Sequence, residues 1–269
     1  MQITSAMKMV SAAKLKKAQD AITMLRPYSE KMQEILQNIS SDLDAEMGGE
    51  FTKSNSGNTI LIVVITSNRG LCGAFNSNVI KEIRTQLNEN FIDKEISFVT
   101  IGKKAFDAFK KGNYSLRNES SIWDNLSLEN VNAISDSLMQ QFKNNEYSKI
   151  YLVYNHFKNA ATQEVKFEQL LPIQLPEKTD TKNSDYIFEP SKSQIVLDIL
   201  PKTIRTQVFK AILDSHASEH GARMTAMHKA TDNADALRKA LILSYNKARQ
   251  AAITKEILEI VGGAESLKG

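Results

Sequence analysis

Several features that mark membrane-spanning, secreted or zinc-binding chains are missing from this sequence. One cysteine, Cys72, occurs in 269 residues, so an internal disulfide and metal motifs that need paired cysteines are both excluded. The longest purely apolar run, at 60–65, is six residues long, whereas a membrane-spanning helix needs about 20. No apolar signal segment and no Arg-rich transit segment stands near Met1. These absences predict a soluble, cytoplasmic chain.

The common phosphate-binding motifs are also absent. Gly70 and Gly73 follow a strand-like run and precede a helical pattern, as in a dinucleotide-binding turn. However, the chain contains neither G-x-G-x-x-G nor G-x-x-x-x-G-K-[ST]. Gly102 stands before Lys103 without the upstream glycine that a phosphate loop needs. We therefore expect tight turns here, with no bound nucleotide or other cofactor.

What the chain does contain is an ordinary globular composition with an uneven charge distribution. Hydrophobic residues make up 42% and charged residues 24%, with a net charge of +3. The balance is +3 over residues 1–21 and +5 over residues 201–252, which leaves −5 for the remainder. The terminal segments are thus basic, and this favours an acidic partner around them.

The pattern of residues divides the chain into three parts, which we delimit as 1–57, 58–190 and 191–269. The first part has apolar residues at helical spacing, and Pro27 is expected to kink or interrupt that helix. The second part alternates strand and helix patterns, which is typical of a parallel, Rossmann-like α/β sheet. Strands are predicted at 59–66, 96–101 and 149–154, an edge strand at 163–171, helices at 76–90, 103–111 and 128–142, and a polar linker at 176–185.

The third part is predicted to be one long helix that starts at Pro201. About 60 residues at 1.5 Å each give roughly 90 Å, whereas a globule of this chain length is roughly 45–50 Å across. The helix must therefore project. One stripe of mostly small residues follows a coiled-coil spacing: Arg223, Met227, Ala230, Ala234, Leu237, Leu241, Ser244, Ala248 and Ala251. We expect a long antiparallel coiled coil of the two terminal helices, with two independent surface helices as the alternative.

Four longer segments carry more specific information than periodicity. They are QITSAMKMVSAAKLKKAQ at 2–19, SNRGLCGAFN at 67–76, ASEHGARMTAMHKATDN at 217–233 and YNKARQAAITKE at 245–256. From end to end, and in order, they resemble the γ subunit family of the F-type ATP synthase. The resemblance implies a non-catalytic shaft inside a ring of three α and three β subunits, coupling proton flow to ATP synthesis or hydrolysis. It also implies that the α/β domain lies beside ε and the membrane c-ring, peripheral to the cytoplasmic face of the bacterial inner membrane.

The resemblance also carries over partner-contact residues by position. Met7 aligns with the methionine that faces an acidic loop of a β subunit. The other aligned shaft residues are polar: Arg223, Arg249, Gln250, Thr254 and Glu256. No catalytic or metal-binding residue is implied.

Two departures from the family pattern stand out. Gly221 takes the place of a better helix former. We expect it to soften the long C-terminal helix, here called the rod, by lowering its helix stability by about 1 kcal/mol relative to Ala. The family also has further turns of helix before the QIT segment, which implies a partner helix that is shorter at the end reaching deepest into the ring.

Two other functions compete with the shaft. His216, Glu219 and His220 fit the H-x-x-E-H pattern of zinc peptidases, which keeps a metallopeptidase or a nucleotide-binding enzyme on the central domain as the alternative. A third zinc ligand is not evident, and the stripe places both histidines toward the partner helix. The basic helices could also form a nucleic-acid-binding coiled coil, but they lack the interleaved aromatic residues that stack on bases. We therefore expect no nucleic-acid partner.

Overall fold

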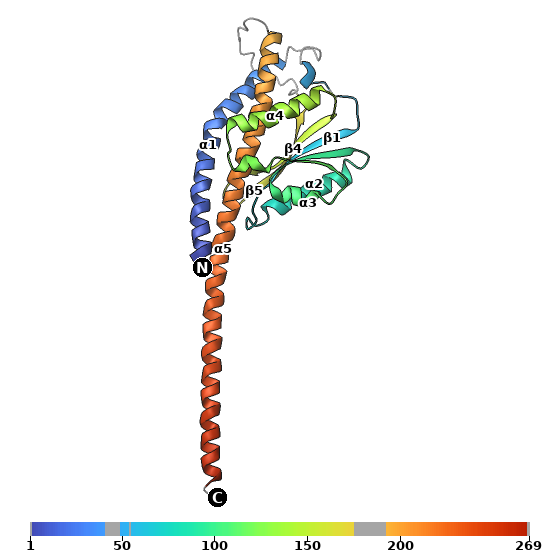
Figure 1. Ribbon diagram of the computed structural model, residues 1–269. Helices are drawn as coiled ribbons and strands as arrows, with labels where there is room; N and C mark the ends of the chain where they lie inside the picture. Colours follow the sequence, from blue (N-terminus) through green and yellow to red (C-terminus); the bar gives the residue numbers. More distant parts are fainter. Residues whose placement is uncertain (1, 41–48, 54, 175–191, 268–269) are drawn as a thin grey trace.

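The protein consists of two long antiparallel helices with an α/β domain against one side of them (Figure 1). The computed structural model describes residues 2–40, 49–53, 55–174 and 192–267. The long helices are α1 (Gln2–Ser40) and α5 (Lys192–Ser266). The predicted linker at 176–185 lies outside the described residues. Between the long helices come η1 (Gly49–Phe51), β1 (Thr59–Ile65), α2 (Phe75–Glu89), β2 (Glu95–Ile101), α3 (Lys103–Phe109), β3 (Ser115–Asn118), η2 (Ser120–Trp123), α4 (Leu128–Lys143), β4 (Lys149–Phe157) and β5 (Gln163–Leu171).

The domain is built on a five-stranded sheet with the order β3-β2-β1-β4-β5. Its first four strands run parallel, and β5 pairs antiparallel with β4 at the edge, which confirms the predicted parallel sheet and edge strand. β1 is central, and every residue of its apolar run at 60–65 is at most 2% exposed. One hydrophobic cluster joins the sheet to α4 and α5, and a second joins it to α2 and α3. Strand β3 was missed by the sequence patterns, because four residues of sequence SLRN are too short and polar to show one.

The terminal helices pack antiparallel, as predicted. Leu15, Ala18 and Ile22 of α1 are buried in one cluster with Leu213 and Ala217 of α5. Near the start of α1, the Thr231 hydroxyl donates to the Thr4 hydroxyl over 2.8 Å. The small side chains of Ala18 and Ala217 allow the two helices to approach closely. The pairing brings the start of α1 beside the middle of α5, far from the C-terminus (Figure 1).

The boundaries of the long helices differ from the predicted ones. α5 begins at Lys192, so Pro201 lies inside it rather than at its first position. At its other end the helix continues through Gly262 and Gly263 to Ser266. The lost hydrogen bond at Pro201 is offset by packing, because Leu200 and Ile204 beside it are fully buried. α1 likewise continues through Pro27 without interruption, and it curves toward its C-terminal end in Figure 1.

The lower part of α5 projects alone, away from the domain (Figure 1). The 75 residues of the helix span about 110 Å. Because α1 starts level with Thr231, the stripe predicted for the coiled coil has no partner beyond that level among the described residues. All residues from 236 to 267 are exposed, including Leu237 and Leu241 at 61%. The predicted projection is confirmed, whereas the coiled coil covers less of α5 than the stripe suggested.

Candidate functional site

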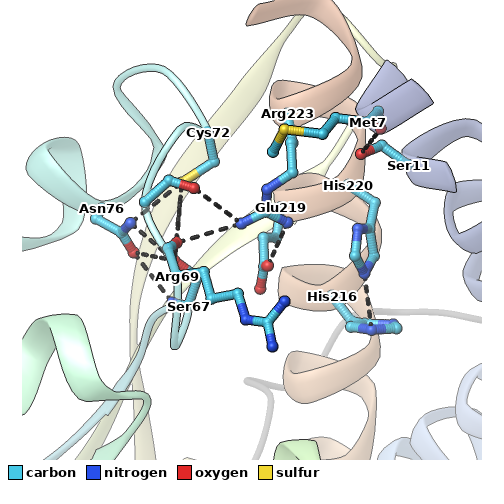
Figure 2. A network of polar contacts seen from close by, with 11 residues as sticks. Met7, Ser11, Ser67, Arg69, Cys72, Asn76, His216, Glu219, His220 and Arg223 are labelled. Carbon is cyan, nitrogen blue, oxygen red and sulfur yellow. Dashed lines mark hydrogen bonds and ion pairs between the residues drawn. The ribbon is translucent and has the colours of Figure 1, made fainter. Parts of the chain in front are cut away.

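A cavity of about 770 Å³ lies where α1, the loop after β1 and α5 meet. Figure 2 shows the polar side chains that gather beside it. Its walls are partly apolar and partly charged, and they come from segments far apart in the sequence. They include Ile3, Met7, Val10 and Lys14 of α1, Asn68 to Leu71 of the loop, Trp123 and Asp124, and His216, Glu219, His220 and Arg223 of α5.

The loop between β1 and α2 is held in shape by its own side chains. The Ser67 backbone N–H donates to Asn76 Oδ1 over 3.0 Å, and Asn76 Nδ2 donates to Ser67 Oγ over 2.8 Å. Ser67 Oγ in turn donates to the Arg69 carbonyl over 2.6 Å. Leu71 and Gly73 both adopt positive φ angles, of 64° and 59°. This confirms the tight turn expected at Gly73, and it leaves Leu71 exposed on the cavity rim.

Arg223 connects this loop to α5. Its Nη1 donates to Glu219 Oε1 over 2.6 Å, and its Nη2 donates to the carbonyls of Arg69 and Gly70 over 3.2 and 3.3 Å. Only 9% of Arg223 and 8% of Glu219 are exposed. Burial raises the pKa of Glu219, and Arg223 opposes that effect. The pair therefore acts as a buried, charge-assisted link between the rod and the domain.

His216 and His220 stand one turn apart on the cavity side of α5. Their Nε2 atoms are 3.1 Å apart, and the ring of Trp123 stacks on His216 with centroids 5.4 Å apart. Burial is the main cause that lowers the pKa of His216 to about 4 and of His220 to about 3. Both rings are therefore neutral at pH 7, and one Nε2 carries the proton that the other accepts. Figure 2 shows both rings facing the α1 side, as the stripe predicted.

A second row of α5 residues ties the rod to β4 and the turn after it. His156 Nδ1 lies 2.8 Å from Asp214 Oδ2, and Asp214 is 1% exposed. Ser218 Oγ donates to the Asn155 carbonyl over 3.0 Å. A Cβ on Gly221 would lie 3.1 Å from Ala160 Cα. Gly221, which was expected only to soften the rod, thus lets the turn approach the helix closely.

This geometry does not support a zinc peptidase. The carboxylate of Glu219, which would serve as the general base, is held by Arg223. Within residues 2–40, 49–53, 55–174 and 192–267, no group of three His, Cys, Asp or Glu side chains is arranged to hold a metal ion. The described helices also include none that is long and apolar enough to cross a membrane.

Comparison with known proteins decides the family. The family model described as ATP synthase matches residues 1–267. The ATP synthase gamma chain of Flavobacterium psychrophilum is 59% identical, with 100% of this chain and 94% of the relative covered. The chain belongs to the ATP synthase gamma chain family. The gamma chains of Christiangramia forsetii and Cytophaga hutchinsonii are 57% and 47% identical, over 100% and 99% of this chain and 94% and 93% of theirs.

Solved structures agree with this assignment. A chain of the Tetrahymena thermophila mitochondrial ATP synthase central stalk and c-ring has a TM-score of 0.61 at 26% identity, with 85% of this chain and 99% of that chain covered. A Euglena gracilis mitochondrial ATP synthase chain has a TM-score of 0.59 at 20% identity, over 98% and 95% of the two chains, and shows the same fold.

The residues implied by the resemblance fall into two groups in the structure. Met7 and Arg223 lie beside the same cavity (Figure 2). Arg249, Gln250, Thr254 and Glu256 are all exposed on the projecting part of α5. The first group thus lies where the gamma-family rod meets its domain, and the second lies well beyond the end of α1.

Several residues of the cavity were not identified from the sequence. Trp123 and Asp124 gave no motif, because their place beside His216 and Glu219 depends on segments far away in the chain. The link from Glu219 to Arg223 did leave a signal, since an acidic residue four positions before an arginine is the favoured ion-pair spacing on a helix.

Proposed function

We propose that this chain is the central rotary shaft of the F1 sector, coupling proton flow through the membrane sector to ATP synthesis or hydrolysis. One observation carries the proposal: in a member of the gamma chain family, the exposed part of α5 projects far from the domain without a partner in the described chain. A helix that exposes a whole face of apolar residues needs a surrounding protein. A ring of three α and three β subunits supplies one.

The mechanism needs no catalytic residue in this chain. An asymmetric rod inside a threefold ring contacts each of three equivalent sites differently, and its rotation passes those differences around the ring. Each site then moves through different nucleotide affinities, which is coupling by differential contact. We therefore assign the chain a non-catalytic role, with no cofactor and no nucleic-acid partner.

The projecting end of α5 would make the contacts inside the ring. We propose that Arg249, Gln250, Thr254 and Glu256 form its polar, direction-dependent contacts, because guanidinium and amide groups can pair with carboxylates and release them again. An apolar group follows directly, and it would turn within an apolar collar. It consists of Ile253, Ile257, Leu258, Ile260 and Val261, which are 46–71% exposed.

Met7 and Arg223 would act near the α/β domain, far from the projecting end of α5. Met7 offers a soft, adaptable contact to an acidic loop of a β subunit. Arg223 differs from the arginine farther along the rod, since its donors already bind Glu219 and the loop carbonyls. We therefore propose that Arg223 serves the partner contact by holding the loop in place beside Met7.

The proposal also assigns the three parts of the chain. Residues 1–57 and 191–269 would form the shaft, and residues 58–190 would form the domain that contacts ε and the c-ring. That arrangement makes the chain peripheral to the cytoplasmic face of the bacterial inner membrane.

Reconstitution with the α and β subunits of the same enzyme tests the shaft. Replacing Arg249 and Gln250 together by Ala should reduce ATP-driven rotation and complex yield several-fold. The matched control replaces Lys16 and Gln19, a cation and an amide that are also exposed but lie on α1. Equal losses from both double variants would contradict the assignment of contacts, and ATP hydrolysis by the isolated chain would contradict the non-catalytic role.

A further inference from the structure

The histidine pair of α5 has a geometry that the shaft does not require. His216 and His220 are spaced i, i+4 on one helix, and their Nε2 atoms lie 3.1 Å apart. Two nitrogens bound to one ion at 2.0–2.1 Å, at angles between a right angle and a tetrahedral one, lie about 2.8–3.4 Å apart. The two donor atoms are therefore already at the separation that a shared metal ion needs.

The cavity beside the pair leaves room for the rest of a coordination shell. Its volume is about 770 Å³, far more than the roughly 30 Å³ that one water molecule occupies in the liquid. Asp124 lines the same cavity and offers carboxylate oxygens, whereas Asn68 Oδ1 already accepts from the Lys103 backbone N–H over 3.0 Å. An ion held by two imidazoles could thus complete its shell with water.

The surrounding charges indicate which ions fit. Lys14 and Arg223 stand near the pair and oppose a cation, and the Glu219 carboxylate is already bound by Arg223. Hard ions such as Mg²⁺ and Ca²⁺ depend on carboxylate oxygens and are disfavoured here. Imidazole nitrogen suits Zn²⁺, Ni²⁺ and Cu²⁺.

We propose that His216 and His220 form a two-histidine site for a divalent transition-metal ion, bound through both Nε2 atoms at the junction of rod and domain. Each neutral ring keeps one proton: the proton that lies between the two Nε2 atoms moves to Nδ1 of its own ring, so both Nε2 lone pairs face the ion and no net proton is released. Water fills the remaining positions. This differs from the expectation drawn from the sequence, which was that the chain holds no metal. The site is a binding site and not a hydrolytic centre, because Glu219 is not available as a base.

The stacked tryptophan provides a direct test. Trp123 is the only tryptophan of the chain, and it stacks on His216, so a paramagnetic ion at the pair should quench its fluorescence. Titrating the full chain with Ni²⁺ should give saturable quenching with one ion per chain, which Zn²⁺ should reverse by competition. His220→Ala should weaken binding at least tenfold while leaving Trp123 stacked on His216.

The matched control is His228→Ala, because His228 is exposed on the same helix and faces Asp232 at i, i+4. This variant should bind Ni²⁺ like the wild type. As a second measurement, Zn²⁺ should raise the melting temperature of the wild type and of His228→Ala, but not that of His220→Ala. If His220→Ala does not fold, His220→Gln takes its place in both measurements. Three results would overturn the proposal. They are quenching that does not saturate, quenching that is equally strong in His220→Ala, and quenching that is lost in His228→Ala. None of these outcomes bears on the rotary role.

Discussion

The two halves of α5 contain similar residues in opposite environments. In the upper half, Leu200, Ile204, Val208 and Ile212 are fully buried against the α/β domain. In the lower half, every residue from 236 to 267 is exposed, although Leu241, Ile242 and Leu243 form a run just as apolar. One continuous helix thus serves as core on one side of Thr231 and as free surface on the other. What surrounds a residue, rather than its hydrophobicity, decides its contribution to stability.

The largest expected difference between the halves is in the free energy of unfolding, when the same Ile→Ala substitution is made in each half. Ile212→Ala removes a fully buried side chain from the main core cluster, and we expect a loss of about 2–4 kcal/mol in the free energy of unfolding. Ile242 is 50% exposed, and Ile242→Ala should change that energy by less than about 0.5 kcal/mol. Denaturant titrations of both variants measure the difference. Equal losses would mean that the lower half is covered in the isolated chain.

A smaller effect is expected where a charge is buried in the upper half. His156→Ala leaves the Asp214 carboxylate buried without its partner, which should cost about 1–3 kcal/mol at pH 7. Burial raises the pKa of Asp214 above its usual value. As pH falls, Asp214 therefore takes up a proton in the folded state before it does so in the unfolded state. The loss of unfolding free energy in His156→Ala should then shrink as pH falls through the pKa that Asp214 has in the folded state.

The control for this variant is His228→Ala, whose partner Asp232 is exposed. It should leave the unfolding energy unchanged within about 0.5 kcal/mol. Chemical denaturation of both variants from pH 7 to pH 4 checks the prediction. A loss in His156→Ala that grew on acidification would contradict the assigned role of Asp214.

The smallest effect compares two glycines inside α5. Gly221→Ala brings a Cβ within 3.1 Å of Ala160 Cα, and this crowding against backbone should cancel the helix-propensity gain of about 1 kcal/mol. Gly262 has open space around it, so Gly262→Ala should raise local helix stability in full. Hydrogen exchange of the amides around each position measures this. A clear gain at Gly221 would show that the turn after β4 yields easily.

Much of the fold could be predicted from local patterns. The buried run of β1, the alternation of strands and helices, and the excessive length of the last helix are all visible without neighbours. The errors were at places where packing overrides local preference. Pro201 lies within α5 because Leu200 and Ile204 pack on the domain, and β3 exists because its four residues pair with β2.

The site was less predictable than the fold. The position of Met7 near Arg223 follows from the antiparallel pairing of the two terminal helices, α1 and α5. The hydrogen bonds of Arg223 do not, because its acceptors, the carbonyls of Arg69 and Gly70, are about 150 residues away and point at it through a loop held by Ser67 and Asn76.

The sequence by itself determined that the long helix exists, that it is basic and carries a stripe of small residues, and that it is longer than its own domain, since these properties depend on periodicity, charge and length. Only the tertiary structure decided where α5 changes from buried to exposed, that Arg223 is buried, and that His216 and His220 contact each other beside Trp123. Those properties depend on side chains that meet through space, and their energies arise from desolvation and distance, which no local pattern contains.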